Sequence, residues 1–189
     1  MGLTRITAPA EQPLTRLEVK DFLRLDHDLD DAMLDALIAS ATAAAEAFTR
    51  RALITQTWDW TLDALPAVLE VPLPPLQSVG SITYIDSAGA SQTLASTEYT
   101  VDAASQRGRI VPAFGKTWPA TQGVVNAVTV RFTAGYGDRT AVPQPIRLAM
   151  LQHVAHWYEH RESVVVGAAV SEMAAAGARL LGPYRSLTL

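Results

Sequence analysis

Residues 30–51, DDAMLDALIASATAAAEAFTRR, carry the strongest local pattern of the sequence. Apolar residues recur in this stretch at intervals of three and four, which is the spacing of one face of an α-helix. They are Met33, Leu34, Leu37, Ile38, Ala41, Ala45 and Phe48. Acidic residues open the stretch and two arginines close it, as the partial charges at helix ends favour. The stretch therefore predicts a long helix, which its many alanines also favour.

Further helices are expected on both sides of this one. Upstream, Thr15 and Glu18 have the spacing of a capping box, which begins a shorter helix. Downstream, Pro143 and Pro145 suit the first turn of a helix. The apolar residues that then follow at helical spacing are Ile146, Met150, Leu151, Val154, Trp157 and Tyr158. A last helix is expected around Ser171–Leu181, before the stop signal Gly182-Pro183.

The region between these helices, residues 53–135, changes to short strands. Alternating or β-branched segments occur at residues 55–62, 81–86, 92–94, 99–101, 109–111 and 127–133. Ser87-Ala88-Gly89 predicts a hairpin turn between two of them. We therefore expect an α+β fold: a helical core of two N-terminal and two C-terminal helices, with a β-rich insertion of about six short strands. We expect residues 1–189 to form a single domain, helical at 14–52 and 143–182, with the insertion at 53–135.

The composition excludes several classes of protein. The 189 residues include 15 basic and 19 acidic side chains and no cysteine, which gives a net charge of −4. A chain without cysteine has no disulfide framework, cysteine-ligated metal site or cysteine nucleophile. The mild acidity argues against a free-standing nucleic-acid-binding protein. The longest apolar run, residues 164–170, is far shorter than the roughly 20 residues of a membrane span, so we expect no membrane partner and synthesis in a cytoplasm.

One motif could carry metal chemistry. His156-Trp157-Tyr158-Glu159-His160 matches the H-x-x-E-H pattern, in which two histidines on one helix face bind zinc and the glutamate activates water. The alternative function is therefore a zinc-dependent hydrolase that uses His156, Glu159 and His160. Such a site needs a third ligand, for which only Glu162 and Glu172 lie downstream. We favour the interpretation that this is the polar face of an interfacial helix with Trp157 in the core.

Other candidate motifs fail at their diagnostic positions. Residues 26–31, DHDLDD, begin like a calcium loop, but Asp31 stands where glycine is needed and Leu37 where glutamate is needed. Gly135-Tyr136-Gly137 follows a strand without the remaining residues of a phosphate-binding loop. The sequence also contains no G-x-S-x-G elbow. We therefore assign no catalytic, cofactor-binding or metal-binding residues, and expect a protein that is not an enzyme and has no cofactor.

The order of several short motifs resembles a known family over roughly residues 14–185. The motifs are Leu17-Glu18-Val19-Lys20, Leu23-Arg24-Leu25-Asp26, Asp30-Asp31, Leu53-Ile54-Thr55-Gln56-Thr57-Trp58, Leu73-Pro74-Pro75-Leu76-Gln77-Ser78-Val79, Ile82-Thr83-Tyr84-Ile85-Asp86, Gly108-Arg109-Ile110, Arg131-Phe132-Thr133-Ala134-Gly135-Tyr136-Gly137, Val142-Pro143 and His156-Trp157-Tyr158. Together they resemble the head–tail connector (adaptor) proteins of long-tailed bacteriophages and prophages. The chain looks close to the version found in gene transfer agents, which are phage-like particles that carry host DNA.

The resemblance implies a structural virion protein without catalytic residues. About twelve copies would form a homo-oligomeric ring by heterologous contacts. The ring would bind the portal protein of the DNA-filled head on one side and a downstream neck or stopper protein on the other. DNA would pass through the lumen without sequence-specific binding, aided by an acidic lumen that repels phosphates. We further expect a free monomer in the host cytoplasm that assembles on the portal, and expect residues 163–189 to fold onto a partner.

Overall fold

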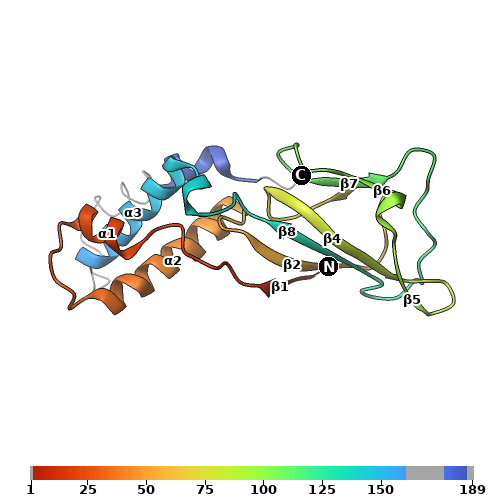
Figure 1. The fold of residues 1–189 in the computed structure, drawn as a ribbon, viewed down its shortest axis with the longest axis horizontal. Coiled ribbons are helices and arrows are strands. Elements are labelled where there is room, and N and C mark those ends of the chain that lie inside the picture. Colours follow the sequence, from red (N-terminus) through yellow and green to blue (C-terminus); the bar gives the residue numbers. More distant parts are fainter. Residues whose placement is uncertain (1, 161–176, 187–189) are drawn as a thin grey trace. The chain divides into compact units, whose positions relative to one another are not determined.

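The computed structural model describes residues 2–160 and 177–186 (Figure 1). The chain divides into two compact units, each built from two separate stretches of sequence. Residues 1–10 and 55–136 form a β unit, and residues 11–54 and 137–189 form a helical unit. Helices and antiparallel sheets together confirm the expected α+β class. The expectation that the whole chain acts as one domain stays a prediction.

The β unit contains two antiparallel sheets. The larger has the strand order β1 (Gly2–Thr7), β2 (Gln56–Leu62), β8 (Val128–Ala134), β4 (Leu76–Ile85) and β5 (Ser91–Thr93). The smaller has the order β3 (Leu69–Glu70), β7 (Arg109–Pro112) and β6 (Tyr99–Asp102), with the short helix η1 (Ser96–Glu98) before β6. The hairpin expected around residues 87–89 is present and joins β4 to β5. The strand segments expected between residues 55 and 133 are therefore confirmed.

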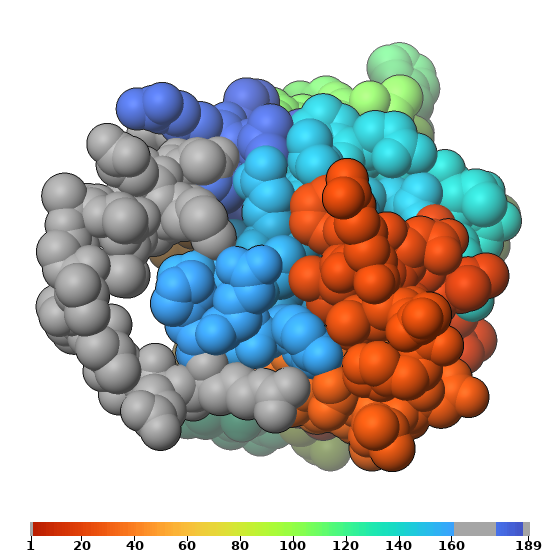
Figure 2. Space-filling view, turned by 90° about the vertical axis from the view of Figure 1, so that its left-hand side faces the viewer, coloured from red at the N-terminus to blue at the C-terminus, as the bar shows by residue number. Residues whose placement is uncertain are grey.

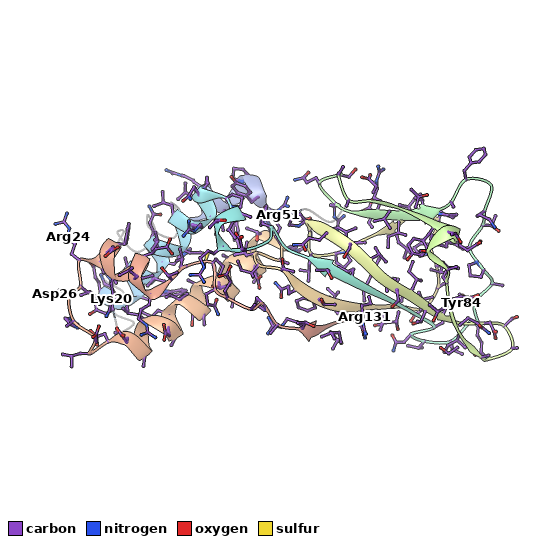
Figure 3. The ribbon with its side chains drawn as sticks, viewed as in Figure 1. Lys20, Arg24, Asp26, Arg51, Tyr84 and Arg131 are labelled. Carbon is purple, nitrogen blue, oxygen red and sulfur yellow. The ribbon has the colours of Figure 1, made fainter. Side chains whose placement is uncertain are left out.

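Strand β8 explains why the larger sheet has one apolar face and one polar face. Val128, Val130, Phe132 and Ala134 alternate along it and are fully buried. The residues between them point to the opposite face, where Arg131 (Figure 3) pairs with Asp59 on β2 at 2.7 Å. Since β8 pairs with β2 on one side and β4 on the other, its buried residues organise the core of the unit.

The helical unit contains α1 (Arg16–Leu23), α2 (Asp31–Thr49) and α3 (Gln144–Glu159), with the short helices η2 (Arg139–Ala141) and η3 (Gly182–Tyr184). Residues 177–181 are also helical, and the rest of the helix expected at Ser171–Leu181 lies outside the described residues. The helical segments contribute these fully or nearly fully buried apolar residues to the core: Val19, Leu34, Ile38, Ala41, Ala45, Ile146, Ala149, Met150, Val154 and Leu181. Figure 2 shows residues 177–186 (dark blue) beside α3 (bright blue).

The predicted start of α1 is confirmed in detail. The Glu18 N–H donates to Thr15 Oγ1 at 3.1 Å, and the Thr15 N–H donates to the Glu18 carboxylate at 2.8 Å. The two residues thereby satisfy each other's free backbone donors. Helix α2 is long and apolar enough to cross a membrane by length and composition alone. Core helices of soluble proteins pass the same test, and α2 buries Leu34 and Ile38 within the helical unit.

The structure adds two strands that the sequence pattern did not predict. Strand β1 pairs with β2, so the β unit includes the N-terminus as well as the segment after residue 53. All six residues of β1 are exposed, so it carries no alternation of buried and exposed positions. Strand β3 has only two residues and lies among prolines. Both strands form because they pair with a neighbouring strand. A local sequence pattern contains no information about such a partner.

The close approach of Gly108 to Leu76 provides a test of the β-unit packing. A Cβ atom at residue 108 would lie 2.4 Å from both Cβ and Cδ2 of Leu76. We expect Gly108→Ala to lower the free energy of unfolding by about 1–3 kcal/mol because the core must shift to admit the methyl group. Gly123→Ala is the matched control, since a Cβ there meets nothing within 4 Å.

The measurement is denaturant unfolding followed by tryptophan fluorescence, because Trp58, Trp60 and Trp118 all lie in the β unit. Equal midpoints for the Gly108→Ala and Gly123→Ala variants would show that the contact with Leu76 is not a tight one.

Candidate functional site

The histidine motif lies on the last two turns of α3. The rings of His156 and His160 are 4.6 Å apart between centroids, and His153 stacks on Trp157 at 5.6 Å. A Cβ atom at Gly177 would lie 2.9 Å from His153 Cε1, so residue 177 packs against this ring. Trp157 is only partly buried, so its expected place in the core is wrong. Val154 fills the core position on this part of α3.

The histidine motif is not joined by a third metal-ligating side chain among the described residues. No three His, Asp or Glu side chains in residues 2–160 and 177–186 lie together so that they could hold a metal ion. The carboxylates considered as third ligands, Glu162 and Glu172, lie outside the described residues. The zinc hydrolase built on His156, Glu159 and His160 therefore gains no support from the described residues.

The acidic turn before α2 is occupied by ion pairs with basic residues of α1. Lys20 Nζ lies 2.5 Å from Asp28 and 2.6 Å from Asp31, at the turn seen in Figure 3 beside Arg24 and Asp26. Arg16 also pairs with Asp31, at 2.6 Å. The hydrogen bond from Lys20, helped by that from Arg16, lowers the pKa of Asp31 below its usual 3.8. These contacts join α1 to the start of α2, which is a structural role.

Two further ion pairs hold the N-terminal part of the helical unit to its C-terminal part. Glu11 accepts from the Arg139 guanidinium, and these hydrogen bonds hold the pKa of Glu11 below its usual 4.5. Arg147 on α3 pairs with Glu18. Burial acts to raise the pKa of Glu18, but the Thr15 N–H and Arg147 together lower it. These arginines are therefore engaged within the unit and do not form a basic patch.

The glycine pair after β8 forms a turn and not a phosphate-binding loop. Gly135 and Gly137 have φ values of 127° and 129°, which favour glycine. The Gly135 N–H donates to the Pro75 carbonyl at 3.0 Å, and Gln77 Nε2 donates to the Gly135 carbonyl at 2.8 Å. Because the N–H and the carbonyl of Gly135 both have hydrogen-bond partners, the turn serves to end β8 before residues 137–141.

Exposed apolar side chains are the features that offer contacts to a partner. Phe114 is fully exposed, at 106%, and Leu29 and Val125 are 91% and 78% exposed. In the helical unit, Pro145, Leu148, Leu151 and Leu180 line an open groove of about 350 Å³ together with Gln144. Isolated exposed apolar residues are common, but a fully exposed phenylalanine and an uncharged groove are typical of protein–protein contacts. Sequence patterns did not indicate Phe114, because an isolated aromatic residue has no helical or strand period. Of the groove residues, Leu151 belongs to the apolar spacing that predicts α3.

The half-buried His153 ring generates a prediction about pH. Burial, assisted by the neighbouring His156, lowers the pKa of His153 below its usual 6.5. The unfolded chain therefore takes up a proton at this residue before the folded chain does. We expect the free energy of unfolding to fall as the pH falls from about 7 to about 5, and to recover as the pH rises.

Replacing His153 by glutamine removes this proton uptake and should flatten the profile, which unfolding curves at several pH values measure. His160→Gln, at an exposed position of the same helix, is the control. An unchanged slope in the His153→Gln variant would show that another group causes the pH dependence.

Comparison with known proteins identifies the family. A family model described as "Head completion protein" matches residues 13–177. A chain in the structure "Neck of empty GTA particle computed with C6 symmetry" is 27% identical, with a TM-score of 0.82 and coverage of 100% of this chain and 97% of that one. A chain in "Neck of native GTA particle computed with C12 symmetry" is 26% identical, with a TM-score of 0.79 and the same coverage.

A chain in "Virion of native gene transfer agent (GTA) particle" is 25% identical, with a TM-score of 0.81, and the match covers 100% of the present chain and 97% of the virion chain. No curated protein matches the chain significantly. The resemblance to head–tail connectors, in the version found in gene transfer agents, is thus confirmed. The match over residues 13–177 shows that the chain belongs to the head completion protein family.

Proposed function

We propose that this chain is a structural subunit of the neck of a phage or phage-like particle. About twelve copies form a ring that joins the portal of the DNA-filled head to the next neck protein on the tail side. The observation that carries this proposal is the similarity over the full chain to proteins of gene transfer agent necks, one of them computed with C12 symmetry.

The chemistry of the described residues is compatible with a structural role. The carboxylates with the clearest pairing, Glu11, Glu18 and Asp31, are engaged in ion pairs with arginine or lysine. The one groove described above is apolar and has no ionisable lining residue. Such surfaces bind proteins and do not activate a substrate. A ring also needs only modest affinity at each contact, because many linked contacts multiply their effect.

The charge of the chain suits a channel through which DNA slides. Each copy carries a net charge of −4. DNA-binding proteins neutralise phosphates with lysine and arginine, and release counterions as they do so. A ring whose lumen lacks such a basic surface does not hold the duplex. We therefore propose that DNA passes through the ring without sequence-specific binding.

Deletion of the gene tests this proposal by electron microscopy of the particles produced. We expect DNA-filled heads to accumulate beside detached tails, since the proposed ring joins the two. Expression of the wild-type chain from a second copy of the gene should restore tailed particles. Normal tailed particles in the deletion strain would overturn the proposed function.

Complementation with Glu159→Gln separates a structural role from catalysis. Glu159 is exposed on α3, so its replacement leaves the core intact. It is also the residue that would activate water in a zinc hydrolase of the H-x-x-E-H class. The proposed function predicts full restoration of tailed particles by this variant. A failure to restore them, with normal amounts of the protein, would contradict a purely structural role.

A further inference from the structure

The turn at residues 113–116 presents Phe114 as an apolar projection. The Lys116 N–H donates to the Ala113 carbonyl at 2.9 Å, which closes a β-turn. Gly115 lies within this turn with a φ of 75°, a conformation that glycine adopts readily. Phe114 is 106% exposed and therefore has no packing partner among the described residues of the β unit.

The base of this turn is fixed to the preceding part of the β unit. The Ala113 N–H donates to the Glu98 carbonyl at 3.0 Å, and Lys116 Nζ pairs with the Glu98 carboxylate at 3.0 Å. The backbone and the charged side chain of residue 116 are thus both engaged. A pre-ordered projection loses little entropy on binding, which is the property of an effective binding anchor.

The chemistry around Phe114 favours a protein partner over DNA. Lys116 is the only charged residue between positions 113 and 127, and Glu98 neutralises it. Val125, which is 78% exposed, adds apolar surface to the same loop. A nucleic-acid contact would need several free cations. An aromatic side chain of this kind typically fills an apolar pocket of a protein.

The chain itself carries a pocket of matching chemistry on its helical unit. Pro145, Leu148 and Leu151 of α3 face Leu180 across an open groove of about 350 Å³ whose lining contains no charged residue. A cavity of about 150 Å³ is enough to hold a benzene ring. Leu148 is 41% exposed, so the groove has apolar surface left to bury.

We infer that Phe114 of one copy seats in the groove around Leu148 of a second copy of this chain. Phe114 lies in the β unit and the groove in the helical unit. When Phe114 of one copy fills the groove of a second copy, the groove of the first copy and Phe114 of the second copy remain free. This is a heterologous contact, which generates a ring when the rotation closes. The inference rests on the proposed function, and adds to it the residues that join neighbouring copies.

Cysteine cross-linking in purified particles tests the contact, and the natural chain has no cysteine to interfere. In particles that carry Phe114→Cys together with Leu148→Cys, mild oxidation should give a ladder of covalent oligomers on a non-reducing gel. A mixture of the two single variants should give dimers only, because each copy then has one reactive face. The pair should cross-link at least about tenfold more than a control pair, since the ring places positions 114 and 148 of neighbouring copies opposite each other.

The control pair is Leu29→Cys with Leu148→Cys, because Leu29 is 91% exposed but belongs to the turn before α2. A ladder from the 114–148 pair alone supports the inference. Cross-linking within single copies only, or equal ladders from both pairs, overturns it. If mass spectrometry finds the wild-type chain absent from purified particles, the proposed function fails. If the chain is present and the 114–148 ladder is missing, the inference alone fails.

Discussion

The buried face of β8 is the constraint on which the β unit depends. Val128, Val130 and Phe132 are fully buried, and the strand pairs on both sides. Sliding β8 by one residue would move this apolar face to the polar side, where Arg131 and Asp59 pair. The register of β2 and β4 follows from this condition.

In the helical unit, Glu18 performs two structural functions. Its carboxylate closes the capping box with Thr15 and also accepts from Arg147 on α3. Together with Glu11–Arg139, it joins segments far apart in sequence, and Lys20–Asp31 joins α1 to the start of α2. These charges stabilise the packing of the helical unit. This use of the ionisable residues agrees with membership of a family of virion structural proteins.

Signals confined to a few neighbouring residues predicted the fold well. The capping box at Thr15 and the alternation around Val130 both record contacts within one element or one face, and both are present. Strand β1 escaped prediction because all its residues are exposed and its order comes from pairing with β2. The sequence pattern does not predict the exposed Phe114, because an aromatic residue in a turn has no periodic neighbours. Its proposed contact is with the surface of another copy, and the pattern of residues along one chain does not indicate such a contact.

In the proposed function, the chain forms a ring in the neck of a particle. The most direct measurement is cryo-electron microscopy of the head–tail junction in particles that contain this protein, with the β and helical units fitted separately. The proposal predicts a closed ring with the C12 symmetry of the related neck, in which each repeat accommodates both units of one copy. A junction whose density is filled completely by other proteins would contradict it.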